Sequence, residues 1–261
     1  MSDEAHHKGQ VIGQFSQQAE GYGRLTSSMA DNGRNAAFSA LVGARADDVV
    51  LDVCCGTGAI ALGLAPYVAQ VTGLDLTPAM LAQARAGQER QGLTNIIWME
   101  GDIYALPFAD GAFSLVTSGA AFHHVTNPRD AFRELVRVCR QGGRVVVRDV
   151  TPDAEKSAEY YRMEILRDPS HTHALTAEEM SRLGQGLPVG PPALHPSVAA
   201  DLPLDAILAT SFPEACNIAE LRAMFHEDAL SGEDRLGFKA RLVGDEIRVS
   251  YAQTTAIWNK L

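Results

Sequence analysis

The sequence predicts an α/β protein with a mostly parallel sheet, and three observations support this prediction. From residue 49 onward, apolar runs of strand length alternate with stretches of helical periodicity. A glycine turn, Asp52 to Gly58 (DVCCGTG), joins the first strand to the helix that follows, as in ligand-binding α/β sheets. The chain has 261 residues, which is enough for one domain with a substantial apolar core.

The first half of the chain supplies the parallel part of the sheet. Residues 8–43 read as helical, with apolar side chains recurring at helical spacing at Val11, Phe15, Ala19 and Tyr22. Strands are expected at 49–53, 70–75, 95–100, 113–118 and 144–150, and helices at 58–66, 78–90 and 128–139. Thr77 and Pro78 mark a helix start, because Thr is a favoured N-cap and Pro is favoured at the first helical position. Strands and helices in this order predict right-handed parallel crossovers.

The pattern changes after Thr151. Helices are expected at 153–167, 176–184, 204–211 and 217–229. The stretch from Gly184 to Pro203 contains five prolines and therefore predicts a loop or an edge segment. Two alternating runs, 238–243 and 246–257, are joined by Gly244-Asp245, which predicts an antiparallel hairpin at the end of the sheet.

The overall charge favours a small molecule as the partner. The formal net charge is −10, from 32 acidic and 22 basic residues, and the sequence contains no Lys/Arg cluster. Such a chain is repelled by phosphate backbones and anionic lipids, so nucleic acid and membrane surfaces are not expected partners. No apolar run is long enough to span a bilayer, and the polar start MSDEAHHKGQ lacks a secretory signal. We expect a cytoplasmic protein, either a monomer or a homodimer.

The four cysteines predict packing roles. They are Cys54, Cys55, Cys139 and Cys216. Adjacent cysteines lack the two-residue spacing that lets one turn supply two thiolates to zinc. Small residues are also favoured in a glycine turn, so metal or redox roles for Cys54 and Cys55 are the less favoured alternative and no metal is expected.

The glycine turn admits two kinds of cofactor. Gly56, Gly58 and Ala61 satisfy a loose Gly-x-Gly-x-x-Ala pattern, which also occurs in nicotinamide-binding proteins. However, Asp52 immediately precedes the turn, where a carboxylate would repel a pyrophosphate. It would instead attract the ammonium of a cofactor that carries an amino acid.

Polar side chains follow three of the predicted strands. Asp75 ends the second strand, where a carboxylate can accept both hydroxyls of a ribose, although a plain surface carboxylate would have the same appearance. Asp102, in Gly101-Asp102-Ile103, can bind an adenine amino group while Ile103 packs on the ring, or it can simply cap a turn. His123 and His124 follow the fourth strand and could accept a substrate proton or only bind backbone.

Together these segments resemble the class I S-adenosylmethionine-dependent methyltransferases, in particular the branch with the ubiquinone/menaquinone-biosynthesis enzymes and many small-molecule methyltransferases. The matching segments run in order from about residue 15 to 150: FSQQAEGY, LDVCCGTG, VTGLD followed by Thr77 to Leu81, GD at 101–102, LPFADGAFSLV, HHV, RELVRV and GGRVVV. Two departures are Cys54, where the family commonly has Gly or Ala, and Cys139-Arg140-Gln141, which replaces a frequent Leu-Lys-Pro.

The resemblance implies a Rossmann-like methyltransferase fold with a seven-stranded, mostly parallel sheet ending in an antiparallel hairpin. It divides the single domain into a helical lid (1–45), a cofactor-binding core (46–152), a substrate cap (153–235) and a closing hairpin (236–261). The implied S-adenosylmethionine site comprises Tyr22 in the lid, Asp52, Cys54, Gly56, Thr57 and Gly58 near the methionine part, Asp75 at the ribose, Asp102 and Ile103 at the adenine, Ser118 and Gly119 beneath the methionine part, and Leu76, Met80 and Gly101.

The implied reaction is in-line methyl transfer to an O-, N- or C-nucleophile of a quinone, phenol or heterocyclic metabolite, with S-adenosylhomocysteine as product. His123, His124 and His171 are the candidates for a catalytic base. Met163, Leu166, Phe212, Met224 and Phe225 could make the acceptor pocket apolar, although such residues more often form plain core. Two alternatives remain: a nicotinamide-dependent oxidoreductase and a non-catalytic S-adenosylmethionine-binding module.

Overall fold

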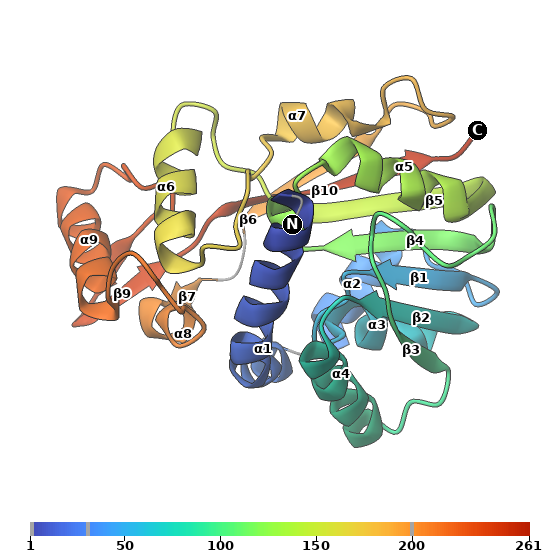
Figure 1. The fold of residues 1–261 in the computed structure, drawn as a ribbon, viewed down its shortest axis with the longest axis horizontal. Helices are drawn as coiled ribbons and strands as arrows, with labels where there is room; N and C mark the ends of the chain where they lie inside the picture. The colour runs from blue at the N-terminus through green and yellow to red at the C-terminus, as the bar shows by residue number, and fades with distance from the viewer. Residues whose placement is uncertain (1–2, 30–31, 199–200) are drawn as a thin grey trace.

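Seven strands form the central sheet, in the order β3-β2-β1-β4-β5-β10-β6 (Figure 1). The computed structural model describes residues 3–29, 32–198 and 201–261. The five parallel strands are β1 (Val49–Val53), β2 (Gln70–Asp75), β3 (Ile96–Glu100), β4 (Phe113–Gly119) and β5 (Cys139–Val150). Two more strands extend the sheet, β10 (Ala252–Asn259) and β6 (Ala193–Val198), and β10 pairs antiparallel with both β5 and β6.

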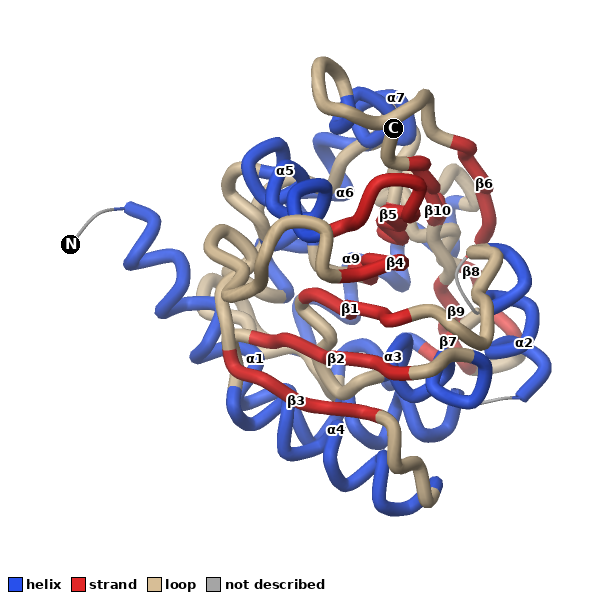
Figure 2. Tube along the Cα trace, turned by 90° about the vertical axis from the view of Figure 1, so that its right-hand side faces the viewer, coloured by secondary structure: helices blue, strands red, loops and turns tan. Residues whose placement is uncertain are grey.

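Apolar side chains on both faces of the strands hold helices against the sheet. One face packs on α2 (Asn32–Leu41), α3 (Ala59–Leu64) and α4 (Pro78–Gln91), and the other on α5 (Pro128–Val138) and α7 (Ala177–Ser181). Val146 belongs to the apolar cluster on the face of α2 and α3, whereas its neighbours Val145 and Val147 belong to the cluster on the face of α5. This alternation explains why these strands are continuous apolar runs, since both faces are covered (Figure 2).

A separate apolar core, in addition to the two clusters that flank the sheet, lies beyond the end of the sheet. It joins α6 (Ser157–Arg167), α8 (Leu204–Leu208) and α9 (Ile218–Ser231) to a small sheet of β7 (Leu202–Pro203), β9 (Glu246–Val249) and β8 (Arg241–Val243). We call this unit the cap. Its cluster is separate from the two that flank the main sheet.

Helix α1 (Asp3–Met29) lies between the sheet and the cap (Figure 1). Two glycines of α1 allow its backbone to pack closely against α4 on one side and against the cap on the other. A Cβ on Gly23 would lie 2.6 Å from Gln83 Oε1 of α4, and one on Gly21 would lie 3.1 Å from Thr210 Cγ2 of the cap. None of the described helices combines the length and the apolarity that a bilayer-spanning helix needs.

The predicted fold class is confirmed, with differences at the end of the sheet. The Gly244-Asp245 turn does join two antiparallel strands, but this β8–β9 hairpin belongs to the cap. The predicted run 246–257 divides at Ser250 and Tyr251, and only its second part enters the main sheet as β10. Its outer partner is β6, inside the stretch predicted as a loop or edge segment, where an edge strand tolerates Pro196 because only one side is paired. The division into lid, core, cap and closing hairpin stays a prediction.

Candidate active site

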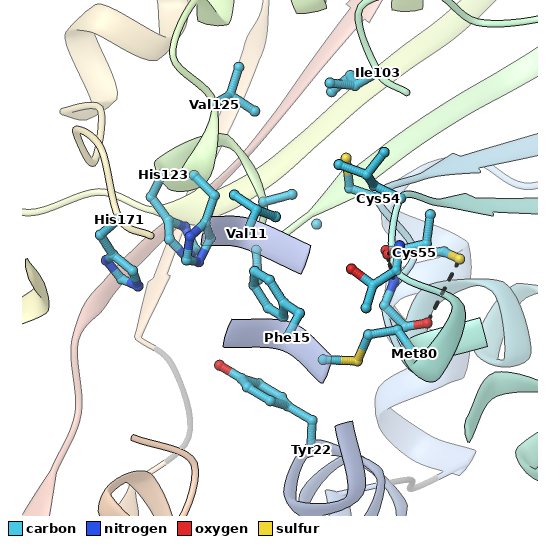
Figure 3. Close-up of a pocket in the computed structure, with 18 of the residues that line it drawn as sticks. Val11, Phe15, Tyr22, Cys54, Cys55, Met80, Ile103, His123, Val125 and His171 are labelled. Atoms are coloured by element: carbon cyan, nitrogen blue, oxygen red, sulfur yellow. Dashed lines mark hydrogen bonds between the residues drawn. The ribbon is translucent and has the colours of Figure 1, made fainter. Parts of the chain in front are cut away.

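A cavity of about 300 Å³ opens at the carboxyl ends of the parallel strands, between the sheet, α1 and the cap. Loops that follow β1, β2, β3 and β4 form one side of it, and residues of α1, α6 and the cap form the other. Figure 3 shows Cys54, Cys55 and Met80 on one side, His123 and His171 on the other, and Val11 and Phe15 of α1 between them. This is the edge at which open α/β sheets bind ligands.

Most of the predicted cofactor residues line this cavity. They are Tyr22, Cys54, Gly56, Thr57, Asp75, Leu76, Met80, Gly101, Asp102, Ile103 and Gly119. The remaining three, Asp52, Gly58 and Ser118, lie behind the wall of the cavity. The Ser118 hydroxyl is buried and has no hydrogen-bond partner among the described residues.

The glycine turn requires left-handed backbone at three positions. Cys54, Gly56 and Gly58 have φ angles of 54°, 53° and 82°. A Cβ on Gly58 would lie 2.6 Å from the Trp98 ring, whereas one on Gly56 would meet no described atom within 4 Å and would project into open space. Cys54 adopts this conformation as a non-glycine residue, at a typical cost of about 1–2 kcal/mol.

Asp75 connects the glycine turn to the start of α4. Its Oδ2 accepts a hydrogen bond from the Gly56 amide at 2.7 Å, and its Oδ1 accepts one from the Thr77 amide at 2.8 Å. Burial raises the pKa of this carboxyl group, against the opposing effect of those amides. A carboxylate oxygen can accept two hydrogen bonds, so Asp75 retains acceptor capacity for a ligand.

Asp52 lies beneath the turn. It accepts hydrogen bonds from the Thr117 hydroxyl at 2.8 Å and from the Ala61 amide at 3.1 Å. Burial raises its pKa to about 7, although these two hydrogen bonds favour the charged form. Asp52 is therefore ionised above about pH 7 and largely protonated below it.

Helix α1 reaches the predicted adenine-binding residues through Lys8. The Lys8 ammonium lies 2.6 Å from Asp102 Oδ2, and Asp102 Oδ1 accepts a hydrogen bond from the Tyr104 amide at 3.0 Å. The hydrogen bond with Asp102 raises the pKa of Lys8. Lys8 and Tyr104 line the cavity but were not predicted. Lys8 is distant from Asp102 in the sequence, whereas the position of Tyr104 shortly after Asp102 was an available signal.

The three predicted histidines meet at the far end of the cavity. His123 and His124 belong to the short helix η2 (Phe122–His124) after β4, and His171 follows α6. Their ring centroids are separated by 4.3 to 4.8 Å. Although His171 is distant in sequence, the cap brings it against the carboxyl end of β4, and all three line the cavity.

Asp149 of β5 positions the loop that carries His123. Its Oδ2 accepts hydrogen bonds from the amides of residues 121–123, and its Oδ1 lies 2.6 Å from His123 Nδ1. Burial lowers the pKa of His123 but the Asp149 carboxylate raises it by more, so the pKa lies above its ordinary value. The sequence analysis did not identify Asp149. Its position near the end of a parallel strand, like that of Asp75, could have indicated it.

Helix α6 contributes a buried ionic group that the sequence did not reveal. Glu164 Oε2 lies 2.5 Å from Arg167 Nη2 and 3.0 Å from His171 Nδ1. Despite burial, the charges of Arg167 and His171 hold the pKa of Glu164 well below its usual range. Glu164 and Arg167 are three residues apart, a spacing at which side chains meet on one face of a helix. This spacing could have indicated an ion pair, but not its position beside His171.

Of the two roles considered for five apolar residues after residue 160, acceptor pocket or plain core, the structure supports plain core. In the described structure, Met163, Leu166, Phe212, Met224 and Phe225 do not line the cavity. Met163 and Phe225 are buried in the cap core, and Leu166 and Met224 pack against it. The cap side is instead lined by ionisable residues, Tyr160, Glu164, Arg167, His171 and Tyr251, together with Leu202 and Ile207.

Comparisons with known proteins agree with this geometry. Residues 51–147 match the family model described as a methyltransferase domain. Residues 51–147 therefore belong to a methyltransferase domain. The chain is 35% identical over 137 residues to the uncharacterized methyltransferase YcgJ of Bacillus subtilis, covering 52% of this chain and 54% of that protein. It is 43% identical over 105 residues to a demethylmenaquinone methyltransferase of Thermus thermophilus, covering 40% of this chain and 47% of the relative.

A solved structure matches more of this chain than the sequence alignments do. These alignments span about half the length of the curated relatives. The crystal structure of Bacillus subtilis YcgJ has a TM-score of 0.75 and covers 87% of this chain and 97% of that one. At 23% identity, this likeness concerns the fold alone.

Proposed function

We propose that this protein transfers a methyl group from S-adenosylmethionine to a small-molecule acceptor. The observation that carries the proposal is one cavity with two chemically different sides. The glycine turn and Asp75 line one side, and His123, His124 and His171 line the other. A cofactor site and an acceptor site in one enclosed space suit a direct transfer.

The cofactor side fits S-adenosylmethionine. Gly56 leaves room where any other residue would project a Cβ, and Asp75 retains acceptor capacity for a ribose diol. Asp102 and Ile103 line the cavity, which supports their proposed contact with the adenine. When ionised, the carboxyl group of Asp52 would favour the ammonium of the cofactor. When bound, the cofactor supplies a methyl group that is already activated as a sulfonium.

The residues of this chain then align, enclose and deprotonate the acceptor. Phe15 and Tyr22 of α1 cover the cavity, which limits the access of water. Alignment of two reactants can contribute about 7–11 kcal/mol in favourable cases. An acceptor that loses a proton needs a group to take it, and the three imidazoles are positioned for this role.

The acceptor class is a quinone, phenol or heterocyclic metabolite. Apolar side chains such as Val125 and Ile207 share the cavity with the histidines, so a ring can be buried while its polar group meets an imidazole. Several relatives carry names of quinone methyltransferases, among them demethylmenaquinone methyltransferase and ubiquinone/menaquinone biosynthesis C-methyltransferase, which supports this class. The net charge of −10 favours a small molecule over nucleic acid. A cytoplasmic location and a monomeric or homodimeric state remain expectations.

Mass spectrometry of reactions with a panel of quinols, phenols and N-heterocycles tests the proposal. We expect one acceptor class to gain a single methyl group, with S-adenosylhomocysteine formed in equal amount. His123→Gln should lower the rate by about 10²- to 10⁴-fold, as for loss of a proton-accepting group. The exposed His173 provides the control, and His173→Gln should retain the native rate. Cofactor binding without methylation in any class would favour the non-catalytic alternative.

A further inference from the structure

We propose that His123, His124 and His171, whose rings meet at one end of the cavity, bind a divalent transition-metal cation such as Zn²⁺. The proposal deepens the proposed function and rests on it for the identity of the acceptor. It departs from the expectation of a metal-free protein, because the structure brings the three histidines, which were predicted only as candidate bases, close enough together to share one ion.

The three histidine rings must move closer together to bind one metal ion. One nitrogen from each of the three rings lies within 4.8 Å of those of the other two. Three imidazoles at zinc–nitrogen distances of about 2.0–2.1 Å require closer spacing, which side-chain rotation can provide. Two of the histidines are adjacent on η2, and the third comes from the loop after α6.

Each ring already has the outer partner that metal-binding histidines usually have. The Nδ1 of His123 lies 2.6 Å from Asp149, that of His171 lies 3.0 Å from Glu164, and that of His124 lies 3.0 Å from the Ser170 carbonyl. Because these oxygens accept hydrogen bonds, each Nδ1 carries the proton and each Nε2 presents its lone pair. This is the arrangement that fixes the tautomer and orientation of a metal ligand.

The surrounding charges favour a dication. Two buried carboxylates, Asp149 and Glu164, lie against His123 and His171, and the buried guanidinium of Arg167 contacts Glu164 and His171. Arg167 Nη2 lies 3.4 Å from His171 Nε2 and must withdraw from that lone pair when a metal binds. Its contact with Glu164 at 2.5 Å gives it a place to remain.

A three-histidine site leaves a coordination position open. Catalytic zinc sites have this form, with three protein ligands and one position for water or substrate. Here that position would face the cavity, where an acceptor hydroxyl or enol oxygen could occupy it. A bound cation would lower the pKa of such an oxygen, so its proton could pass to water, and the three histidines would then act as metal ligands in place of a proton acceptor.

The test is titration of chelator-treated full-length protein with Zn²⁺ by calorimetry and with Co²⁺ by absorption spectroscopy. We expect one equivalent to bind, with a Co²⁺ spectrum typical of imidazole ligation. His171→Gln should weaken Zn²⁺ binding by more than about 100-fold. Asp149→Asn alters the outer partner of His123 and the anchor of its loop, and should weaken Zn²⁺ binding by about 10- to 100-fold. His173→Gln should leave Zn²⁺ affinity unchanged.

The same samples are titrated with S-adenosylhomocysteine, which also reports whether each variant is folded. No Zn²⁺ binding, or equal binding by native protein and His171→Gln, would overturn the metal site while leaving the cofactor site intact. Zn²⁺ binding by protein that does not bind S-adenosylhomocysteine would support the metal site and count against the proposed function.

Discussion

At the scale of single residues, two buried carboxylates serve the same turn in different ways. Asp75 lines the cavity and ties the turn to α4, whereas Asp52 lies behind the turn and contacts Thr117 and Ala61. Both have a raised pKa because both are buried. The chain therefore places two groups of unusual protonation behaviour beside the proposed methionine and ribose positions.

The pKa of Asp52 predicts a pH dependence of cofactor binding. Below pH 7 its carboxyl group is largely protonated in the free protein, and an ammonium nearby requires it to lose that proton. The affinity for S-adenosylhomocysteine should thus rise with pH up to about 7, by at most about tenfold per unit, and then level off. Calorimetry between pH 5 and 9 measures this profile, and Asp52→Asn should flatten it. An Asp52→Asn profile identical to the native one would contradict the assignment.

The role of a residue could be predicted where a suitable side chain directly follows a predicted strand. Asp75 and Asp102 could be identified because each follows a strand that ends at the ligand-binding edge. Glu164 and Arg167 could not, because their role depends on how α6 packs against the loop after β4. The three histidines were identified singly, but their meeting depends on the same packing.

At the scale of elements, the glycine turn is fixed by its neighbour β3. Trp98 of β3 fills the space beside Gly58, and its Nε1 donates a hydrogen bond to Gln88 of α4. The strand, the turn and the helix are therefore packed as one unit.

Gly58→Ala should destabilise the protein for two reasons. Its φ of 82° costs an L-residue about 1–2 kcal/mol, and its Cβ would lie 2.6 Å from the Trp98 ring. Gly232→Ala is the matched control, since Gly232 has a φ of 68° but its Cβ would meet no described atom within 4 Å. Urea unfolding should show the larger loss of free energy for Gly58→Ala. Equal losses would show that Trp98 does not restrict the turn.

Helix α1 should control the exchange of the cofactor. Lys8→Ala removes the ion pair with Asp102, and partly exposed pairs contribute about 0.2–1 kcal/mol. We therefore expect S-adenosylhomocysteine to dissociate about 1.4- to 5-fold faster from Lys8→Ala in stopped-flow measurements. Arg24→Ala, on the same helix but at an exposed pair with Glu20, should dissociate at the native rate. A slower rate for Lys8→Ala would mean that Lys8 competes with the ligand for Asp102.

The elements themselves were predicted well where periodicity was regular. The five parallel strands and helices α3, α4 and α5 lie close to their predicted ranges. Strand β6 was not predicted as such because it contains Pro196 and borders β10 on one side, so its formation depends on a strand more than 50 residues later in the chain.

At the scale of the whole molecule, the cavity lies between two cores that pack separately. The sheet is flanked by two apolar clusters, and the cap has its own. Tyr160 connects the cap core to the cavity, since it lines the cavity and stacks on Phe238 with ring centroids 4.5 Å apart.

Phe238→Ala should destabilise the cap more than the sheet. Removal of a buried phenylalanine costs about 3–5 kcal/mol, and Phe238 is buried within the cap core. Hydrogen exchange should accelerate in α6, α9 and the β8–β9 hairpin, with less change in β1 and β4. Leu230→Ala, at an exposed position of α9, should change neither region. Equal acceleration in the sheet and the cap would show that they unfold as one unit.

The central claim is that the cavity binds S-adenosylmethionine, and calorimetric titration with S-adenosylhomocysteine, with NADH in parallel, tests it most directly. We expect one-to-one micromolar binding of S-adenosylhomocysteine and none of NADH. Asp75→Ala should weaken that binding by about 10- to 150-fold, from the loss of hydrogen bonds to a charged group. Asp47→Ala, at an exposed carboxylate before β1, should bind as the native protein does. Binding of NADH alone would contradict the account and favour the nicotinamide alternative.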